Sequence, residues 1–392
     1  MGLSSVSMGW GQTYQVLYTF TGGADGAFPF TGLIRDSAGN LYGTTAGEKT
    51  GTVFKLSPHG KFKLLQSFAV PEGIYDWPFS ALARDSKGNL YGTIYYGGTD
   101  NLGMVYKLDK DDNFSALYNF TEPWDYVGGG PLGPPILDAA GNLYGAAGGN
   151  GKCNGGGPVC GVIFELSPNG DETVLHGFSR PRNGDYPEAG LVRDTAGNLY
   201  GTTMGGGHAG NGIVFKLDSS GNETVLHTFM GKPDGAKPQF GLIQDKVGNL
   251  YGVTPEGGKL GCESNLTCGV IFKVDTSGNE TILYSFTGGS DGGNPYGPLI
   301  MDTAGNLYGV ASFGKLSNGD PGFGVIFKLA PSGKETVIYT FTGGSDGLGP
   351  TGLVMDSAGN FYGTTAGGGN LNDCIPPGGL GDGCGVVFKL TP

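Results

Sequence analysis

Short runs in which apolar and polar residues alternate recur along this chain, and four such runs make up one unit. The clearest unit has its runs at Phe240–Asp245, Asn249–Thr254, Gly269–Val274 and Glu280–Phe286. Runs this short, separated by turn residues, predict β-strands rather than helices. A D-x-x-G-N turn joins the first two runs and another short turn joins the last two. We therefore expect each unit to be an antiparallel sheet of four strands, A to D.

The unit is repeated along the whole chain. Its signature G-N-[LF]-Y-G places a tyrosine at intervals of 49 to 57 residues, at Tyr42, Tyr91, Tyr144, Tyr200, Tyr251, Tyr308 and Tyr362. Repeats of about this length with four strands each are typical of propeller blades. The sequence therefore predicts an all-β, seven-bladed β-propeller with four antiparallel strands per blade, as a single domain over residues 1–392.

The two ends of the chain complement each other. The chain begins with a D-type run, Tyr14–Phe20, and ends with a C-type run, Gly385–Leu390, that no D strand follows. We expect strand 14–20 to complete blade 7, because this pairing removes a free sheet edge. In such blades the B–C loops and the D–A connections share one face. We call it the loop-rich face and expect binding residues there.

Composition agrees with strands and turns. Glycine supplies 80 of the 392 residues, and it costs about 1 kcal/mol relative to alanine inside a helix. The 38% of hydrophobic residues argues against disorder. With 23 basic and 35 acidic residues the net charge is −12 and no basic cluster occurs, so no nucleic acid partner is expected. No apolar run approaches the ~18 residues of a spanning helix, so we expect no membrane insertion.

The repeated unit resembles that of the GloVer family, which consists of secreted bacterial tandem-repeat proteins. The unit of that family reads D-x-x-G-N-L-Y-G-T-T, then a glycine-rich stretch, then G-V-[VI]-F-K-L and E-T-V-L-Y-x-F. The resemblance extends from about Tyr14 to Leu390. It implies an extracellular protein and no particular catalytic activity. The blade order is also similar to that of NHL-type propellers, which include both binding proteins and enzymes.

All six cysteines lie in B–C loops, two to a loop, and the second of each pair precedes a C strand. The pairs are Cys153 with Cys160, Cys262 with Cys268, and Cys374 with Cys384. This arrangement predicts three local disulfides and an oxidising compartment, hence an extracellular or periplasmic protein. Residues 1–11 do not have the pattern of a signal peptide. The cysteine spacings do not fit a zinc site, and no histidine lies beside them.

Four D–A connections contain an Asp-Gly pair, at Asp25, Asp234, Asp291 and Asp346. One interpretation is a β-turn in which the carboxylate caps local backbone amides. The other is a group of carboxylates that binds calcium or a cationic ligand. No connection has the alternating acidic residues of an EF-hand. We therefore predict no metal site and no cofactor, with calcium as the remaining candidate.

Aromatic and acidic residues gather in the D–A connections before blades 2, 3 and 4. They are Tyr75, Asp76, Trp77, Trp124, Asp125, Tyr126, Asp185 and Tyr186. The B–C loop of blade 2 adds Tyr96 beside Tyr95, and that of blade 4 adds His208. Aromatic rings stack on the C–H faces of sugars, so these residues predict a site for a glycan or cell-surface polysaccharide. Alternatively, Trp77 and Trp124 pack over the gaps between blades.

No nucleophile elbow is predicted: G-x-S-x-G occurs only as the G-G-S-D-G of two D–A connections, at 288–292 and 343–347, and the chain has no H-E-x-x-H or P-loop sequence. His176 and His227 replace the tyrosine of a D strand and are interpreted as packing residues. The leading hypothesis is a secreted binding or surface-interaction protein. The alternatives are a polysaccharide lyase or glycosidase that uses carboxylates of the loop-rich face, and a structural protein that self-assembles. The sequence predicts neither catalytic residues nor the oligomeric state.

Overall fold

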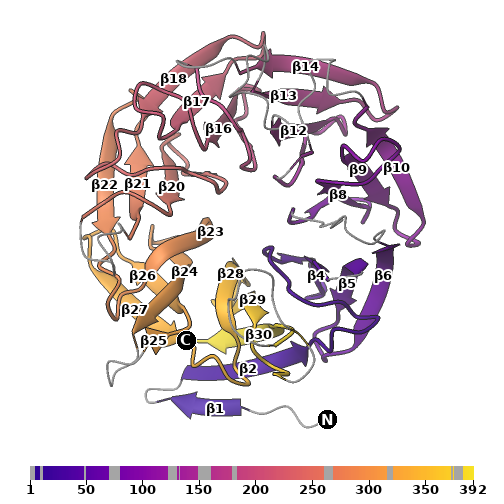
Figure 1. The fold of residues 1–392 in the computed structure, drawn as a ribbon, viewed down its shortest axis with the longest axis vertical. Helices are drawn as coiled ribbons and strands as arrows, with labels where there is room; N and C mark the ends of the chain where they lie inside the picture. Colours follow the sequence, from indigo (N-terminus) through magenta and orange to yellow (C-terminus); the bar gives the residue numbers. More distant parts are fainter. Residues whose placement is uncertain are drawn as a thin grey trace. The chain divides into compact units, whose positions relative to one another are not determined.

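The structure is a computed structural model of the chain. It describes residues 5–8, 12–47, 50–69, 80–121, 130–131, 133–148, 160–178, 183–259, 268–315, 321–371, 374 and 383–392. Every regular element in these ranges is a β-strand, and no helix in them could cross a membrane. The strands form seven sheets, each built from four strands of the repeat (Figure 1). The predicted all-β class and the seven four-stranded blades are confirmed.

The chain separates into two compact units, and the first contains blades 1, 6 and 7. It comprises Met1–Trp77, Gly261–Ser264 and Phe286–Pro392. Blade 1 contains β3 (Ile34–Arg35), β4 (Leu41–Thr45), β5 (Thr50–Leu56) and β6 (Phe62–Ala69). Blade 6 contains β23 (Gly293–Met301), β24 (Leu307–Lys315), β26 (Val325–Leu329) and β27 (Glu335–Thr340), with β25 (Pro321–Gly322) paired to β24. Blade 7 contains β28 (Leu348–Met355), β29 (Phe361–Gly367), β30 (Val386–Thr391) and β2 (Gln12–Thr19).

The second unit, Pro78–Leu260 with Asn265–Ser285, contains blades 2 to 5. Blade 2 contains β7 (Ala83–Arg84), β8 (Leu90–Ile94), β9 (Met104–Leu108) and β10 (Phe114–Asn119). Blade 3 contains β11 (Ile136–Leu137), β12 (Leu143–Gly148), β13 (Gly161–Leu166) and β14 (Glu172–Gly177). Blade 4 contains β15 (Val192–Arg193), β16 (Leu199–Thr203), β17 (Ile213–Leu217) and β18 (Glu223–Thr228). Blade 5 contains β19 (Ile243–Gln244), β20 (Leu250–Thr254), β21 (Val270–Val274) and β22 (Glu280–Ser285).

The A strands are the elements that differ most from prediction. The run Phe240–Asp245 yields only the two-residue strand Ile243–Gln244, whereas the A strands of blades 6 and 7 have nine and eight residues although each contains proline and glycine. The expected strand 14–20 is confirmed: β2 pairs antiparallel with β30, with Tyr14 opposite Leu390. The sequence pattern does not predict β1 (Ser5–Met8), which pairs with the outer side of β2. The single domain over 1–392 stays a prediction.

The signature D-x-x-G-N-[LF]-Y folds into one hydrogen-bonded turn. In blade 5, Asp245 accepts hydrogen bonds from the backbone N of Asn249 at 2.9 Å and from its Nδ2 at 2.7 Å. The hydroxyl of Tyr251 donates to the same carboxylate at 3.0 Å. Desolvation alone would raise the pKa of Asp245, but the bonds from Asn249 and Tyr251 outweigh it and lower this pKa. The signature residues are therefore structural.

A pair of phenylalanines links adjacent blades within each unit. Phe229, which follows β18, meets Phe272 of β21 with ring centroids 5.1 Å apart in an edge-to-face arrangement. Both side chains are fully buried. The last glycine of the signature makes room for this ring, because a Cβ on Gly252 would lie 2.6 Å from Cζ of Phe272. Within a unit, the repeat therefore places large aromatic side chains where neighbouring blades pack together.

Candidate functional site

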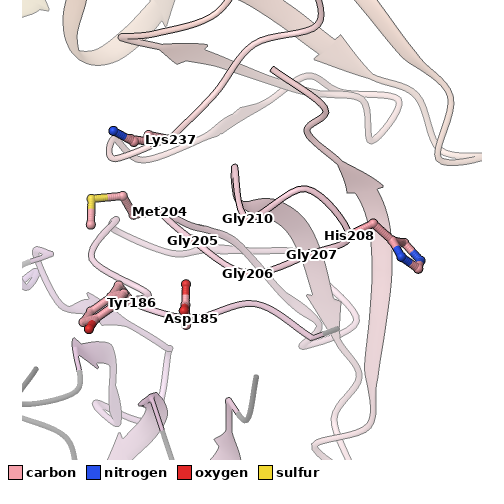
Figure 2. Close-up of a pocket in the computed structure, with 9 residues that line it drawn as sticks. All are labelled: Asp185, Tyr186, Met204, Gly205, Gly206, Gly207, His208, Gly210 and Lys237. Atoms are coloured by element: carbon pink, nitrogen blue, oxygen red, sulfur yellow. The ribbon is translucent and has the colours of Figure 1, made fainter. Parts of the chain in front are cut away.

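A cavity of about 380 Å³ opens on the loop-rich face beside blade 4. Its walls come from the loop between β16 and β17, from the connection after blade 3, and from the connection after blade 4 (Figure 2). The lining residues are Asp185, Tyr186, Met204, Gly205, Gly206, Gly207, His208, Gly210 and Lys237. The glycines have no side chains, so backbone atoms and a few long side chains form the surface of the cavity.

Backbone hydrogen bonds hold the two walls together. Asp185 and Gly205 each donate a backbone N–H to the other's carbonyl at 3.0 Å. The N–H of Met204 donates to the carbonyl of Tyr186 at 3.0 Å. Asp185 is only 2% exposed, whereas Tyr186 is partly buried and His208 is exposed. Backbone hydrogen bonds therefore join the two walls of the cavity, and Asp185 lines it as a buried side chain.

Tyr186 and Lys237 occupy the same unusual backbone position. Each precedes a proline and has a positive φ, 54° for Tyr186 and 55° for Lys237. Phe28 and Asn294 occupy this position in other blades, with φ values of 54° and 53°. A left-handed backbone costs a non-glycine residue roughly 1–2 kcal/mol, and a following proline adds steric restriction. Strain of this kind often accompanies a functional constraint.

The residue at the strained position donates a backbone hydrogen bond to the segment just before the C strand of an adjacent blade. The N–H of Tyr186 donates to the carbonyl of Cys160 at 3.0 Å, and the N–H of Lys237 donates to that of Asn211 at 2.8 Å. Phe28 makes the same bond to the carbonyl of Cys384 at 2.9 Å. The cysteine-bearing loops thus help to orient the side chains that the connections present.

Tyrosines and one acidic side chain form a group near this cavity. The rings of Tyr95 and Tyr96 meet edge to face, 4.4 Å apart. Desolvation, together with the charges of Tyr96, Glu188 and Tyr186, raises the pKa of Tyr95 to about 12. Burial raises the pKa of Glu188 to about 7, so this carboxyl group can exchange a proton near neutral pH. Tyr96 is 43% exposed and offers an accessible ring.

The structure brings part of the predicted site together. Asp185, Tyr186 and His208 line one cavity, and Tyr96 belongs to the neighbouring tyrosine group. Figure 2 shows the His208 ring directed away from Asp185 and Tyr186. The remaining predicted residues lie outside the described ranges: Tyr75, Asp76, Trp77, Trp124, Asp125 and Tyr126. The binding role of all these residues stays a prediction.

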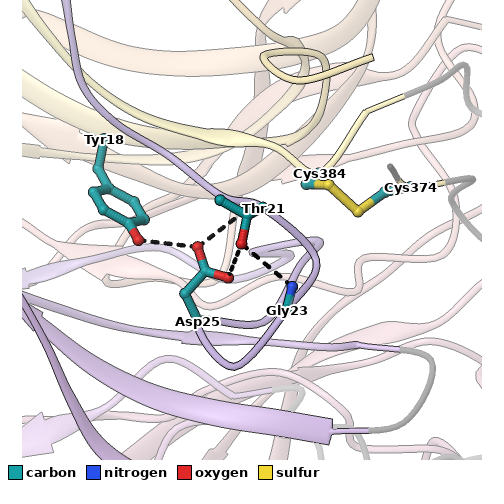
Figure 3. Close-up of a disulfide and its surroundings, with 6 residues drawn as sticks. All are labelled: Tyr18, Thr21, Gly23, Asp25, Cys374 and Cys384. Carbon is teal, nitrogen blue, oxygen red and sulfur yellow. Dashed lines mark hydrogen bonds between the residues drawn. A yellow bond between two sulfur atoms is a disulfide. The ribbon is translucent and has the colours of Figure 1, made fainter. Parts of the chain in front are cut away.

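The Asp-Gly aspartates act as turn caps. Asp25 accepts the backbone N–H of Thr21 at 2.9 Å, the Thr21 hydroxyl at 2.5 Å and the Tyr18 hydroxyl at 2.9 Å (Figure 3). Equivalent bonds from threonines are made to Asp291 and Asp346, and the backbone N–H of Met230 donates to Asp234. These bonds support the turn-capping interpretation. His227 and Glu280 also lie beside Asp234, and none of the three lines the cavity.

One predicted disulfide is confirmed in full: Cys374 and Cys384 are bonded, with Cα atoms 5.1 Å apart (Figure 3). Cys268 is also disulfide-bonded, and Cys262, its expected partner, lies outside the described ranges. Cys160 is buried and has no disulfide partner among the described residues. Because Cys153 is not among them, the bridge between Cys153 and Cys160 stays a prediction.

Sequence reasoning missed Lys237, Glu188 and the grouping of His227 with Asp234 and Glu280. Lys237 directly precedes Pro238, as Tyr186 precedes Pro187, so comparison of the connections could have found it. The perturbed pKa of Glu188 depends on burial that no local pattern reveals.

Seven four-stranded antiparallel sheets built from one repeat define the protein as a seven-bladed β-propeller. The sequence matches the model of the Gloeobacter/Verrucomicrobia repeat over residues 6–159, 46–264 and 153–376. The chain belongs to this family, which confirms the predicted GloVer membership. No curated protein matches the sequence.

Solved structures share the fold at low sequence identity. Virginiamycin B lyase from Staphylococcus aureus is 14% identical, with 97% of this chain and 99% of that chain covered and a TM-score of 0.60. A fungal alcohol oxidase of the AA5 family in complex with copper is 13% identical, with coverages of 96% and 75% and a TM-score of 0.59. Oligogalacturonate lyase from Vibrio parahaemolyticus is 10% identical, with coverages of 99% and 96% and a TM-score of 0.55. These similarities establish the fold and leave the activity open.

Proposed function

We propose that this protein binds a glycan, such as a cell-surface polysaccharide, through the cavity beside blade 4. The observation that carries the proposal is that Tyr186 and Lys237 line one cavity from equivalent, strained backbone positions. The fold maintains this costly conformation at both positions, so the side chains held there are the best candidates for ligand contacts.

The chemistry of the lining fits a sugar. The Tyr186 ring offers a flat face for C–H stacking, and the lysine and the backbone groups of the glycine-rich wall offer hydrogen bonds to hydroxyls. Lys237 also pairs with Glu256 at 2.8 Å, and both side chains are about half exposed. The pair is therefore weak and can open to meet a hydroxyl or carboxylate of the ligand.

The proposed setting is extracellular or periplasmic. The disulfide between Cys374 and Cys384 is typical of an oxidising compartment. A net charge of −12 disfavours nucleic acid as the partner.

Glu188 favours a second candidate function, that of a polysaccharide lyase or glycosidase. A carboxyl group with a pKa of about 7 is suited to general acid or base catalysis at neutral pH. Glu188 and Tyr186 both lie close enough to Tyr95 for their charges to raise its pKa. A tyrosine beside such an acid could supply a second proton-transfer group.

A glycan array followed by titration of the best ligand tests the binding function. Tyr186→Asn is the informative variant, because Asn294 occupies the equivalent backbone position and shows that the conformation accepts asparagine. Loss of an aromatic contact at a binding centre costs ~2 kcal/mol or more, so the affinity should fall at least about tenfold. Tyr186→Phe keeps the ring and should retain most of the affinity. Equal affinity in Tyr186→Asn and the wild type would refute this site.

Incubation of the bound glycan with the protein separates binding from catalysis. New reducing ends or unsaturated products, abolished in Glu188→Gln, would establish the enzyme. Binding without any product would support the binding protein.

A further inference from the structure

Three potential metal ligands meet at the outer edges of blades 4 and 5. His227 lies on β18, Asp234 in the connection after it, and Glu280 at the start of β22. One ligand atom from each side chain lies within 4.8 Å of those of the other two. In the described part of the chain, no other group of three His, Cys or carboxylate side chains has this geometry. Nε2 of His227 is 3.2 Å from Oδ1 of Asp234 and 3.3 Å from Oδ2.

Other blades have a tyrosine at the position of His227. The hydroxyl of Tyr18 donates to Asp25 at 2.9 Å, and that of Tyr339 donates to Asp346 at 3.0 Å. A neutral phenol serves the aspartate only as a hydrogen-bond donor. A neutral imidazole can serve in the same way, or it can turn a nitrogen lone pair toward a metal ion. Blade 4 therefore has a nitrogen ligand where the repeat normally has a donor.

The third side chain, Glu280, has glutamate counterparts in three other blades, at Glu172, Glu223 and Glu335, and aromatic counterparts in blades 1 and 7. In blade 1 the counterpart is Phe62, whose ring stacks on Tyr18 with centroids 4.5 Å apart. In blade 7 it is Tyr14, whose ring stacks on Tyr339 with centroids 4.3 Å apart. In blade 5, Glu280 faces His227 instead. Oε1 of Glu280, like that of Glu172, Glu223 and Glu335, is buried and accepts no hydrogen bond from the described residues, but in the described part of the chain only Glu280 belongs to a three-ligand group with an imidazole and a second carboxylate. An oxygen without a partner beside a second carboxylate and an imidazole is an incomplete polar arrangement, and a cation would complete it.

The electrostatics agree with this picture. Desolvation, followed by the charge of Asp234, raises the pKa of Glu280 to about 7. Desolvation also acts on Asp234, but the hydrogen bonds from His227 and the Met230 N–H outweigh it and lower the pKa of this carboxyl. Two carboxylates therefore repel each other in a partly dry site, and a divalent ion would relieve that repulsion.

We propose that His227, Asp234 and Glu280 bind one divalent transition-metal ion, with Zn²⁺ as the probe. One imidazole nitrogen and two carboxylate oxygens suit Zn²⁺ and related ions, whereas Ca²⁺ prefers an all-oxygen shell. The His227 and Asp234 side chains are 18% and 15% exposed, so an ion can enter from solvent. The ion joins β18 to β22 and so fastens two adjacent blades at their outer strands.

Calorimetric titration of chelator-treated full-length protein with Zn²⁺ tests the proposal, with thermal unfolding as a second measurement. We expect one Zn²⁺ per chain and a melting temperature that rises with Zn²⁺ concentration. Absence of saturable binding would overturn the proposal. Co²⁺ provides a spectroscopic probe, since its visible absorption reports on nitrogen and oxygen ligands.

His227→Tyr is the matched variant, because it installs the residue found at Tyr18 and Tyr339 and keeps a donor to Asp234. It should fold normally and should weaken Zn²⁺ binding at least about 100-fold, since even loss of an outer-shell partner costs about 10–100-fold. Glu280→Gln preserves side-chain shape and should weaken binding similarly. His176→Tyr is the control: His176 lies 3.5 Å from Glu223, and the described residues add no third ligand there, so Zn²⁺ binding should be unchanged. Undiminished binding in His227→Tyr, or its loss in His176→Tyr, would contradict the assignment.

Discussion

The ring of Tyr14 stacks on the ring of Tyr339, with centroids 4.3 Å apart and planes 11° from parallel. Tyr14 belongs to β2 and Tyr339 to β27 of blade 6. The Tyr14 hydroxyl also donates to the carbonyl of Asp346 at 2.6 Å, and Tyr14 is only 3% exposed. Strand β2 therefore completes the sheet of blade 7 and also packs against blade 6.

Deletion of residues 1–20 should cause aggregation or a large loss of thermal stability. The deletion removes the β2 partner of β30 and exposes a strand edge, which invites pairing with other chains. It also removes Phe20, which is fully buried against Phe54. Light scattering and calorimetry on the truncated protein provide the measurements. Deletion of residues 1–8 removes only β1 and is the control. A monomeric 1–20 deletion of unchanged stability would refute the role assigned to β2.

Truncation of one phenylalanine between blades should be strongly destabilising. Phe272→Ala removes a fully buried ring in contact with Phe229, so we expect a loss of ~3–5 kcal/mol in the free energy of unfolding. Val247→Ala is the control, because Val247 is 73% exposed and should change stability by less than ~0.5 kcal/mol. Denaturant unfolding of both variants measures the difference. Similar stabilities would mean that this contact does not hold blades 4 and 5 together.

Glu335 should make stability depend on pH. Desolvation, followed by the charge of Asp291, raises its pKa from 4.5 to about 7 in the folded protein. The folded state thus holds the proton more tightly than the unfolded chain, so this group destabilises the protein as the pH rises from about 4.5 to about 7. Glu335→Gln should match the wild type near pH 4.5 and be more stable at pH 8. Melting curves across this range measure the effect. A Glu335→Gln profile identical to that of the wild type would exclude the effect.

The cysteine pairing can be read directly by peptide mapping under non-reducing conditions. For protein made in an oxidising compartment, we expect local bridges from Cys374 to Cys384, from Cys262 to Cys268 and from Cys153 to Cys160. Thiol titration of the denatured protein should then find no free cysteine. Two free thiols would show that Cys153 and Cys160 remain reduced. Bridges between different loops would contradict the local pattern.

Much of the fold is predictable from the sequence because each strand repeats the same alternation. The signature tyrosines, Tyr251 among them, mark the B strands, and the D-type run at 14–20 has a place only in blade 7. The predicted length of the two-residue A strands is too great, because the alternating pattern continues into segments such as 240–242 that pair with no neighbouring strand. Strand β1 has no counterpart in the repeat, so no pattern indicates it.

The candidate sites are less predictable because they depend on contacts between separate connections. Loop topology places Asp185, Tyr186 and His208 on one face, and they do line one cavity. Comparison of the residues before Pro187 and Pro238 could have found Lys237, but its place in the cavity depends on a left-handed backbone conformation that only the structure shows. His227 and Glu280 meet only because the D strands of blades 4 and 5 are adjacent, and each residue alone resembles an ordinary member of its strand.

The position before the proline has a consequence for how such proteins diverge. It carries Phe28, Tyr186, Lys237 and Asn294 on nearly the same backbone, with φ between 53° and 55°. An apolar ring, a phenol, a cation and an amide are thus interchangeable there without a change of scaffold. The backbone before the proline thus holds one side chain whose chemistry can vary. A lineage can therefore acquire a new ligand preference by single substitutions at this position while its fold stays the same.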